Sequence, residues 1–200
     1  GTIGDFGIYS FFPTKTLGAF GDAGMIVTNN DELASKARAY RIHGSSKKYF
    51  HDYIGYNSRL DTIQAAILLV KIKNIEEAIA ARKRIAELYD SLLSNLIEKG
   101  YIKLPEIIPI NKPVFYVYNI IVKDRDKLVE FLKEKGIGTS IYYPLPLHLQ
   151  KCFSYLGYKK GDFPVSEKIA ESILALPIFP ELTEKEVEYV CDNIKKFYKI

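Results

Sequence analysis

The chain has 200 residues, of which 48% are hydrophobic and 26% are charged. It can therefore bury a substantial core, as one large domain or two small ones. Its apolar runs fall short of the roughly 20 residues that span a bilayer, and we identify no export signal. The net charge of +4 is modest, and lysines alternate with acidic residues. We expect a soluble cytoplasmic protein with neither a membrane nor a nucleic acid as partner.

Cysteine and histidine are scarce in the chain. Cys152 and Cys191 lie far apart, and with the three histidines they form no spacing typical of metal ligands. We expect idle or buried thiols, a reducing compartment and no metal site.

The first third of the chain predicts a strand, a loop, a second strand and a helix. The strands are expected at 6–11 and 23–28, and the helix opens at 30–32, runs to about Ile42 and stops before Gly44. The polar and aromatic segment 45–57 that follows is typical of a surface loop that can contact a ligand or a partner.

The loop between these strands carries Lys15, with Gly18, Gly21 and Gly24 close behind it. A lysine held on such a turn can form a Schiff base with the aldehyde of pyridoxal phosphate (PLP) when the neutral amine is favoured. A solvated surface charge is the alternative, because the chain contains 28 Lys and Arg residues. The glycines allow a close approach of the backbone.

Apolar residues keep helical spacing from Arg59 to Leu96, with a predicted bend near Asn74. A helix this long usually links two bodies. We therefore expect residues 1–73 to be the end of a large domain with the start of the linking helix, and residues 74–200 to be a small α+β domain. In this second part we expect strands at 100–105, 114–122 and 139–143, and helices at 125–135, 165–174 and 187–198, the last opened by a capping signature at 183–186.

Seven segments resemble, in order, the DegT/StrS family of PLP-dependent sugar aminotransferases. The lysine turn is similar to the family's Ser-Phe, Thr-Lys and Gly-Asp-Gly-Gly pattern, although Ala23 stands where the family usually has glycine. The other segments are Arg41-Ile-His43-Gly44, Gly55-Tyr-Asn-Ser-Arg-Leu-Asp61 with Gln64-Ala-Ala, Gly136-Ile-Gly-Thr139, Tyr143-Pro-Leu-Pro-Leu-His148, Gly161-Asp-Phe-Pro164 and Leu176-Pro177.

The resemblance implies an α/β protein of the fold-type I PLP-dependent aminotransferase class. This chain looks like its carboxy-terminal part, the end of the large PLP domain plus the small α+β domain. The family also implies PLP as cofactor and a homodimer with shared active sites. Family members supply further cofactor-binding residues earlier in sequence, and these have no counterpart here.

By resemblance, Lys15 is the catalytic, PLP-binding lysine, and Ser10 donates a hydrogen bond to the cofactor phosphate. Asn57 is expected at the phosphate, and Arg59 near the carboxylate of the amino donor, both in the neighbouring subunit's site. Alternatives stay open: Ser10 ends a strand, and Asn57 can cap the helix that follows. The guanidinium of Arg59 suits a carboxylate, but this chemistry alone does not assign Arg59 to the amino donor.

Tyr143 and His148 lie on a loop stiffened by two prolines. They resemble the small-domain residues that face the sugar nucleotide, and an ordinary surface histidine is the alternative for His148. His43 is expected to be structural, because it stands at a helix end. His51 receives no role.

The activity implied is transfer of an amino group from glutamate or glutamine to a keto sugar nucleotide in polysaccharide or sugar biosynthesis. The alternative is a truncated, non-catalytic fragment, or a subunit that needs a separate amino-terminal part. This alternative is suggested by the start of the chain, where Gly1 lies a few residues before a predicted interior strand. Such a chain would expose an unpaired sheet edge and apolar surface.

Overall fold

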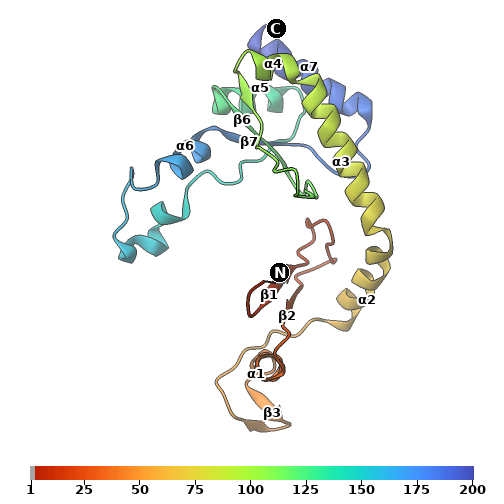
Figure 1. Ribbon diagram of the computed structural model, residues 1–200, viewed down its shortest axis with the longest axis vertical. Helices are drawn as coiled ribbons and strands as arrows, with labels where there is room; N and C mark the ends of the chain where they lie inside the picture. Colours follow the sequence, from red (N-terminus) through yellow and green to blue (C-terminus); the bar gives the residue numbers. More distant parts are fainter. Residues whose placement is uncertain (1–2) are drawn as a thin grey trace. The chain divides into compact units, whose positions relative to one another are not determined.

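The computed structural model describes residues 3–200, which form two compact units that divide between Glu76 and Glu77 (Figure 1). Helix α3 (Ile75–Leu92) begins two residues before this division. The sequence places its domain boundary three residues earlier, between 73 and 74.

The first unit opens with a pair of antiparallel strands. Strand β1 (Gly7–Ser10) pairs with β2 (Gly24–Val27), so that Gly7 lies opposite Val27 and Ser10 opposite Gly24. Both strands are shorter than predicted. Helix α1 (Asp31–Arg41) follows, and the side chain of Asn30 accepts a hydrogen bond from the Leu33 amide at 3.1 Å, as its capping chemistry predicts.

The segment predicted as a surface loop contains two short paired strands, β3 (Ser45–Lys47) and β4 (Phe50–His51). Gly44 precedes them with φ +73°, and a Cβ atom there would lie 1.8 Å from the carbonyl oxygen of Tyr53. A side chain at position 44 is therefore excluded both by the backbone conformation and by the chain that passes beside it.

The predicted long helix is divided into segments. Helix α2 (Thr62–Lys71) is joined to α3 by the 3-10 turn η1 (Ile72–Asn74), where the bend was predicted, and α4 (Ser94–Glu98) follows after a break at Leu93. Residues 59–61 precede the first turn of helix. In the part of the chain that the structure describes, no helix is both long enough and apolar enough to cross a membrane.

The second unit contains a three-stranded antiparallel sheet in the order β5-β6-β7. Its strands are β5 (Ile102–Lys103), β6 (Tyr118–Val122) and β7 (Ile173–Leu176). The sequence extends a helix to Leu174, and this is wrong at its end: α6 (Pro164–Ser172) stops and the apolar run continues as β7, fully buried beside β6. The strand predicted at 139–143 is reduced to one bridge, between Ser140 and Ala175.

Helices α3, α5 (Arg125–Glu134) and α7 (Glu184–Tyr198) pack with this sheet around one core (Figure 1). Helix α7 begins with the predicted capping box, in which Thr183 and Glu186 satisfy each other's backbone amides. Burial raises the pKa of the Cys191 thiol to about 12, so this cysteine is an inert core residue. The fully buried core side chains include Tyr89, Leu93, Leu96, Ile120, Leu128, Leu132, Leu174, Val187 and Ile194.

Candidate active site

Lys15 lies half-buried on the segment 11–23 that joins β1 to β2, called here the lysine loop. Its amide donates to the carbonyl oxygen of Phe12 at 2.9 Å, which forms a tight turn. The amide of Phe11 donates to Ala23 at 2.9 Å, and the amide of Ala19 donates to Phe11 at 2.8 Å. These bonds close the loop on itself, so the backbone that carries Lys15 has a defined conformation.

Gly18 makes this closure possible. A Cβ atom at position 18 would lie 2.4 Å from the carbonyl oxygen of Pro13 and 2.9 Å from that of Phe12. Both contacts are with backbone, so no side chain could move aside to relieve them. The glycine is therefore required where the loop folds back over the turn that carries Lys15.

Helix α2 holds the lysine loop in place. The Oε1 atom of Gln64 accepts from the Phe20 amide at 2.8 Å, and Lys71 Nζ donates to the Gly18 carbonyl oxygen at 2.6 Å. Between them, Leu68 packs with Phe11 and Ala19 in a small buried cluster. Sequence reasoning noted Gln64 as part of a motif without a role and missed Lys71. Their spacing of seven residues, which is two turns on one helix face, is a signal that could have joined them.

Replacing Gln64 by leucine should loosen the lysine loop, because the Phe20 amide loses its acceptor. We expect a loss of about 1 kcal/mol, which corresponds to roughly fivefold faster exchange of the Phe20 amide hydrogen. Hydrogen-exchange NMR at pH 7 measures this rate. Lys73→Met, at an exposed position two residues after the end of α2, is the control and should leave the rate unchanged. An unchanged rate in Gln64→Leu would contradict the assigned role.

Ser10 ends β1 and lies exposed at the entrance to the lysine loop. Its Oγ accepts from the Phe12 amide at 3.4 Å. Since a serine hydroxyl both donates and accepts, the hydrogen of this O–H can be directed to another group. Ser10 thus lies at the end of a strand, as predicted, and its hydroxyl can still donate a hydrogen bond.

Asn57 and Arg59 lie beside the end of α1. Asn57 forms an antiparallel bridge with Ile42, and the N-cap position of α2 is Asp61, so the capping alternative for Asn57 is wrong. Arg59 Nη1 lies 3.3 Å from His43 Nε2. Because a guanidinium only donates, this nitrogen of His43 accepts. His43 therefore orients the arginine, a contact that the sequence did not predict.

His51 completes this group of side chains. Its Nδ1 lies 3.0 Å from the carbonyl oxygen of His43, whose backbone has φ +65°. A carbonyl oxygen only accepts, so His51 Nδ1 carries the hydrogen. The residue without a predicted role thus supports the turn that presents His43 to Arg59.

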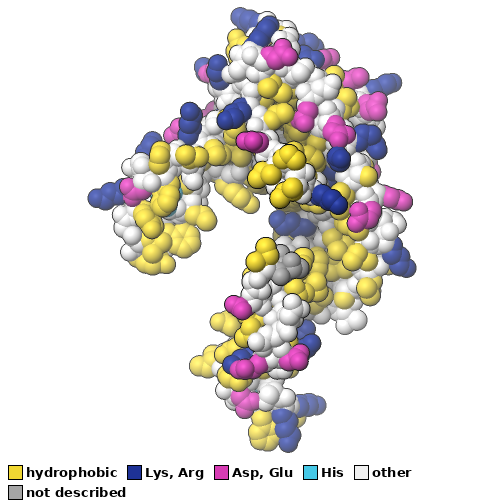
Figure 2. Space-filling view, in the orientation of Figure 1, with side chains coloured by type: hydrophobic (Ala, Val, Ile, Leu, Met, Phe, Trp, Pro, Cys, Tyr) yellow, Lys and Arg dark blue, Asp and Glu magenta, His cyan; other side chains and the backbone are white. Residues whose placement is uncertain are grey.

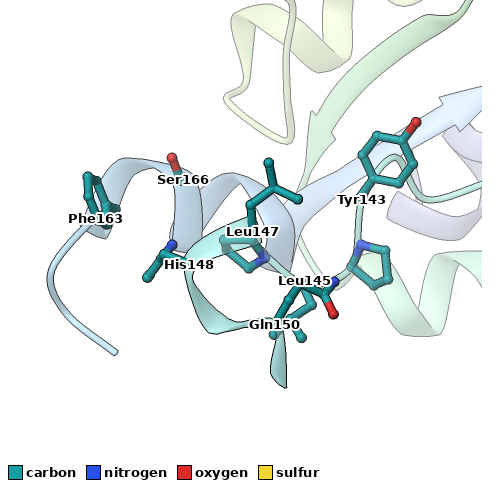
Figure 3. Close-up of a pocket in the computed structure, with 9 residues that line it drawn as sticks. Tyr143, Leu145, Leu147, His148, Gln150, Phe163 and Ser166 are labelled. Atoms are coloured by element: carbon teal, nitrogen blue, oxygen red, sulfur yellow. The ribbon is translucent and has the colours of Figure 1, made fainter. Parts of the chain in front are cut away.

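The second unit contains an open groove of about 590 Å³ formed by the proline-stiffened loop and the start of α6 (Figure 3). Tyr143 and His148, both predicted to bind substrate, line this same groove. Most of the other lining side chains are apolar, which suits the hydrophobic face of a ring. The lining residues are Tyr143, Pro144, Leu145, Pro146, Leu147, His148, Gln150, Phe163 and Ser166.

Glu167 of α6 lies behind the groove and was missed in the sequence. His148 Nε2 is 3.0 Å from its Oε1, with side chains only 9% and 10% exposed, so His148 is not an ordinary surface histidine. The carboxylate also accepts from the amides of Gly161, at 2.8 and 2.9 Å, and Phe163, at 3.4 Å. Burial acts to raise the pKa of Glu167, but the hydrogen bonds from Gly161, His148 and Phe163 outweigh it and lower the pKa.

The second unit should lose stability in acid. Hydrogen bonds from Thr183 likewise lower the pKa of Glu186. Below about pH 4.3, the ordinary glutamate value, the unfolded chain binds more protons than the folded one. The contribution of these carboxylates is therefore complete above that pH and is lost as the pH falls further. Tm measured from pH 3 to 6 should rise with pH, and less steeply in Glu186→Gln. An equal slope in the variant would contradict this.

An α/β chain with a lysine-bearing loop and a small antiparallel domain matches the carboxy-terminal part of a fold-type I aminotransferase. The chain belongs to the DegT/DnrJ/EryC1/StrS aminotransferase family, whose sequence pattern matches residues 1–195. The predicted family and fold class are thereby confirmed.

Curated relatives cover almost the whole chain. A Geobacillus stearothermophilus protein named pleiotropic regulatory protein is 49% identical over 100% of this chain and 53% of its own length. The UDP-N-acetyl-3-dehydro-α-D-glucosamine 3-aminotransferase of Acidithiobacillus ferrooxidans is 41% identical over 98% of this chain and 52% of its own length. The chain thus spans about half the length of the curated relatives it matches.

Solved structures agree with this assignment. An aminotransferase of the family from Brucella abortus aligns with a TM-score of 0.90 and 38% identity, over 100% of this chain and 52% of its own. NtdA from Bacillus subtilis, solved with bound PMP, aligns with a TM-score of 0.88 and 32% identity, over 98% of this chain and 46% of its own. At these identities, the likeness extends beyond the general fold.

Proposed function

We propose that this chain forms the carboxy-terminal part of a cytoplasmic, PLP-dependent aminotransferase. It would move an amino group from glutamate or glutamine to a keto sugar carried on a nucleotide, in polysaccharide or sugar biosynthesis. The observation that carries the proposal is Lys15, half-buried on a closed loop in a chain of an aminotransferase family. The name of the Acidithiobacillus relative supports the substrate class, and the PMP bound to NtdA supports the cofactor.

The lysine loop fits PLP by the chemistry of its donors. A primary amine is fixed on a tight turn, and a hydroxyl stands five residues earlier at the end of β1. When bound, PLP supplies an electron sink for the exchange of the amino group. Lys15 would hold the cofactor and would carry a proton at Nζ. Ser10 would donate its O–H to the phosphate.

Asn57 and Arg59 would bind the cofactor phosphate and the donor carboxylate in the site of a second copy of this chain. Arg59 suits a carboxylate because its planar fork can donate two parallel hydrogen bonds. The contact with His43 orders that fork before a ligand arrives. A homodimer with shared active sites is accordingly part of the proposal.

Tyr143 and His148 would contact the sugar nucleotide in the groove. Apolar side chains such as Leu147 and Phe163 can pack against the C–H face of a sugar ring, while the few polar groups orient it. Figure 3 shows Tyr143 and His148 at separate positions along this groove, so both can contact one extended ligand.

The test is to mix the purified chain with PLP, record the visible spectrum, reduce with borohydride and map the peptides by mass. We expect a Schiff-base absorption band and a pyridoxyl label confined to Lys15. A label scattered over exposed lysines, or no band and no label, would contradict cofactor binding by this chain alone.

The second candidate is a subunit that forms an active site only with a separate polypeptide. The strand pair β1–β2 is a sheet of two strands, which is marginal alone, and Ile8 and Ile26 on it are 79% and 58% exposed. Figure 2 shows such hydrophobic side chains at the surface of the first unit. This candidate predicts no label on the chain alone and tight association with the partner, measurable by size-exclusion chromatography.

A further inference from the structure

Glu167 forms several hydrogen bonds to residues at the groove. Its Oε1 is within 2.8 Å of the Gly161 nitrogen, 3.0 Å of His148 Nε2 and 3.4 Å of the Phe163 nitrogen. Its Oε2 lies 2.9 Å from the same Gly161 nitrogen. The carboxylate therefore links α6 to two segments that line the groove, the turn 161–163 and the loop that ends at His148.

The direction of each of these hydrogen bonds follows from the chemistry of the groups. Backbone amides can only donate, and an ionised carboxylate can only accept. His148 Nε2 must therefore donate its hydrogen to Glu167. When the imidazole is neutral, only one ring nitrogen carries hydrogen, so a His148 that donates from Nε2 has Nδ1 left as a hydrogen-bond acceptor.

The same contacts fix the shape of the groove. The rings of His148 and Phe163 have centroids 4.8 Å apart, and Phe163 meets Tyr158 edge-on at 5.1 Å. Gly161, with φ +101°, lies in the turn whose amides Glu167 binds. Since Glu167 secures both His148 and the Phe163 backbone, it sets the spacing of these two lining residues.

We propose that Glu167 is a positioning residue of the groove, which holds His148 as the Nε2–H tautomer and so presents Nδ1 as an acceptor to a hydroxyl group of the bound sugar. The ligand in this inference, a nucleotide sugar, rests on the proposed function. The tautomer of His148 is a property of this chain alone. A neutral His148 with this orientation would recognise a sugar hydroxyl rather than a phosphate, because a phosphate oxygen offers no hydrogen to Nδ1.

The tautomer is tested by ¹⁵N NMR of the histidine rings of the whole chain at pH 8. We expect His148 to carry its hydrogen on Nε2. Glu167→Ala should produce a mixture of tautomers and at least fivefold faster exchange of the Gly161 and Phe163 amides, while Glu167→Gln, which keeps an acceptor oxygen, should largely retain the wild-type signals. Glu171→Ala is the matched control, since Glu171 is an exposed carboxylate on the same helix and pairs only at 3.8 Å with Lys160.

Two results would overturn the inference: hydrogen on Nδ1 of the wild-type His148 ring, as the Nδ1–H tautomer or the doubly protonated ring, or an unchanged tautomer in a folded Glu167→Ala chain. If Glu167→Ala does not fold, as judged by circular dichroism, the wild-type spectrum decides. The ligand is tested by titrating UDP-N-acetylglucosamine and, separately, UDP. Shifts of the His148 ring signals with the sugar nucleotide alone support hydroxyl recognition, whereas equal shifts with UDP, or none with either, overturn that part. The label on Lys15 tests the proposed function independently.

Discussion

Replacing Lys15 by alanine should abolish the reaction of this chain with PLP: no Schiff-base band, and no pyridoxyl label on the loop peptide after borohydride reduction. The reason is chemical, because no other group on the lysine loop carries a primary amine. Lys15→Arg should fail equally, since a guanidinium does not form a Schiff base at neutral pH. In any preparation that turns over substrate, we expect either change to lower kcat by at least ~100-fold.

Lys73→Ala is the control, because it removes an exposed lysine from the same unit without changing the loop. It should leave both the band and the labelled peptide as in the wild type. Retention of the label pattern in Lys15→Ala would show that PLP reacts with surface amines and that Lys15 has no special role. The experiment thus distinguishes specific labelling of Lys15 from general labelling of the chain's many lysines.

The parts of the fold that local chemistry determines could be predicted from the sequence. Asn30 caps α1, and Thr183 with Glu186 caps α7, because each needs only a polar side chain within three residues of the amides it satisfies. The bend near Asn74 appears as the 3-10 turn between α2 and α3. Each of these signals lies within a few residues of its effect.

Strand β7 was missed because its cause is distant in the sequence. Residues 173–176 continue an apolar run that also suits a helix, and only pairing with β6, some 50 residues earlier, makes them a strand. The strand predicted at 139–143 is also decided by a distant partner, because only Ser140 of this segment pairs with Ala175 of β7. Long-range pairing overrides local pattern in both cases.

The candidate site divides in the same way. Motifs alone led to the six proposed site residues, whose roles stay predictions: Lys15, Ser10, Asn57, Arg59, Tyr143 and His148. The contacts that orient them were not predicted, because sequence spacing does not reveal them: His43 with Arg59, Lys71 with the lysine loop, and Glu167 with His148. A glutamate on an amphipathic helix is ordinarily a solvated charge, and only the fold buries this one.

The largest loss of stability is expected from Arg82→Met in the second unit. Arg82 projects from α3, is 8% exposed, and its Nη1 donates to the carbonyl oxygens of Ile178, at 2.9 Å, Phe115, at 3.3 Å, and Tyr116, at 3.4 Å. Phe115 has φ +44°, a conformation that a non-glycine residue adopts only when its surroundings hold it. Burial lowers the pKa of Arg82, yet a guanidinium stays charged, so it remains a donor to all three carbonyls.

Methionine keeps the apolar stem but leaves these carbonyls without their shared donor and releases the turn at Phe115. We expect a loss of about 2–3 kcal/mol in the free energy of unfolding and a Tm lower by roughly 10 °C. Arg84→Met, an exposed position two residues along the same helix, should change stability by less than about 0.5 kcal/mol. Equal effects of the two changes in urea unfolding would mean that the turn at Phe115 is held by packing alone. A loss confined to Arg82→Met would identify this arginine as the connection between α3 and the segments that precede β6 and follow β7.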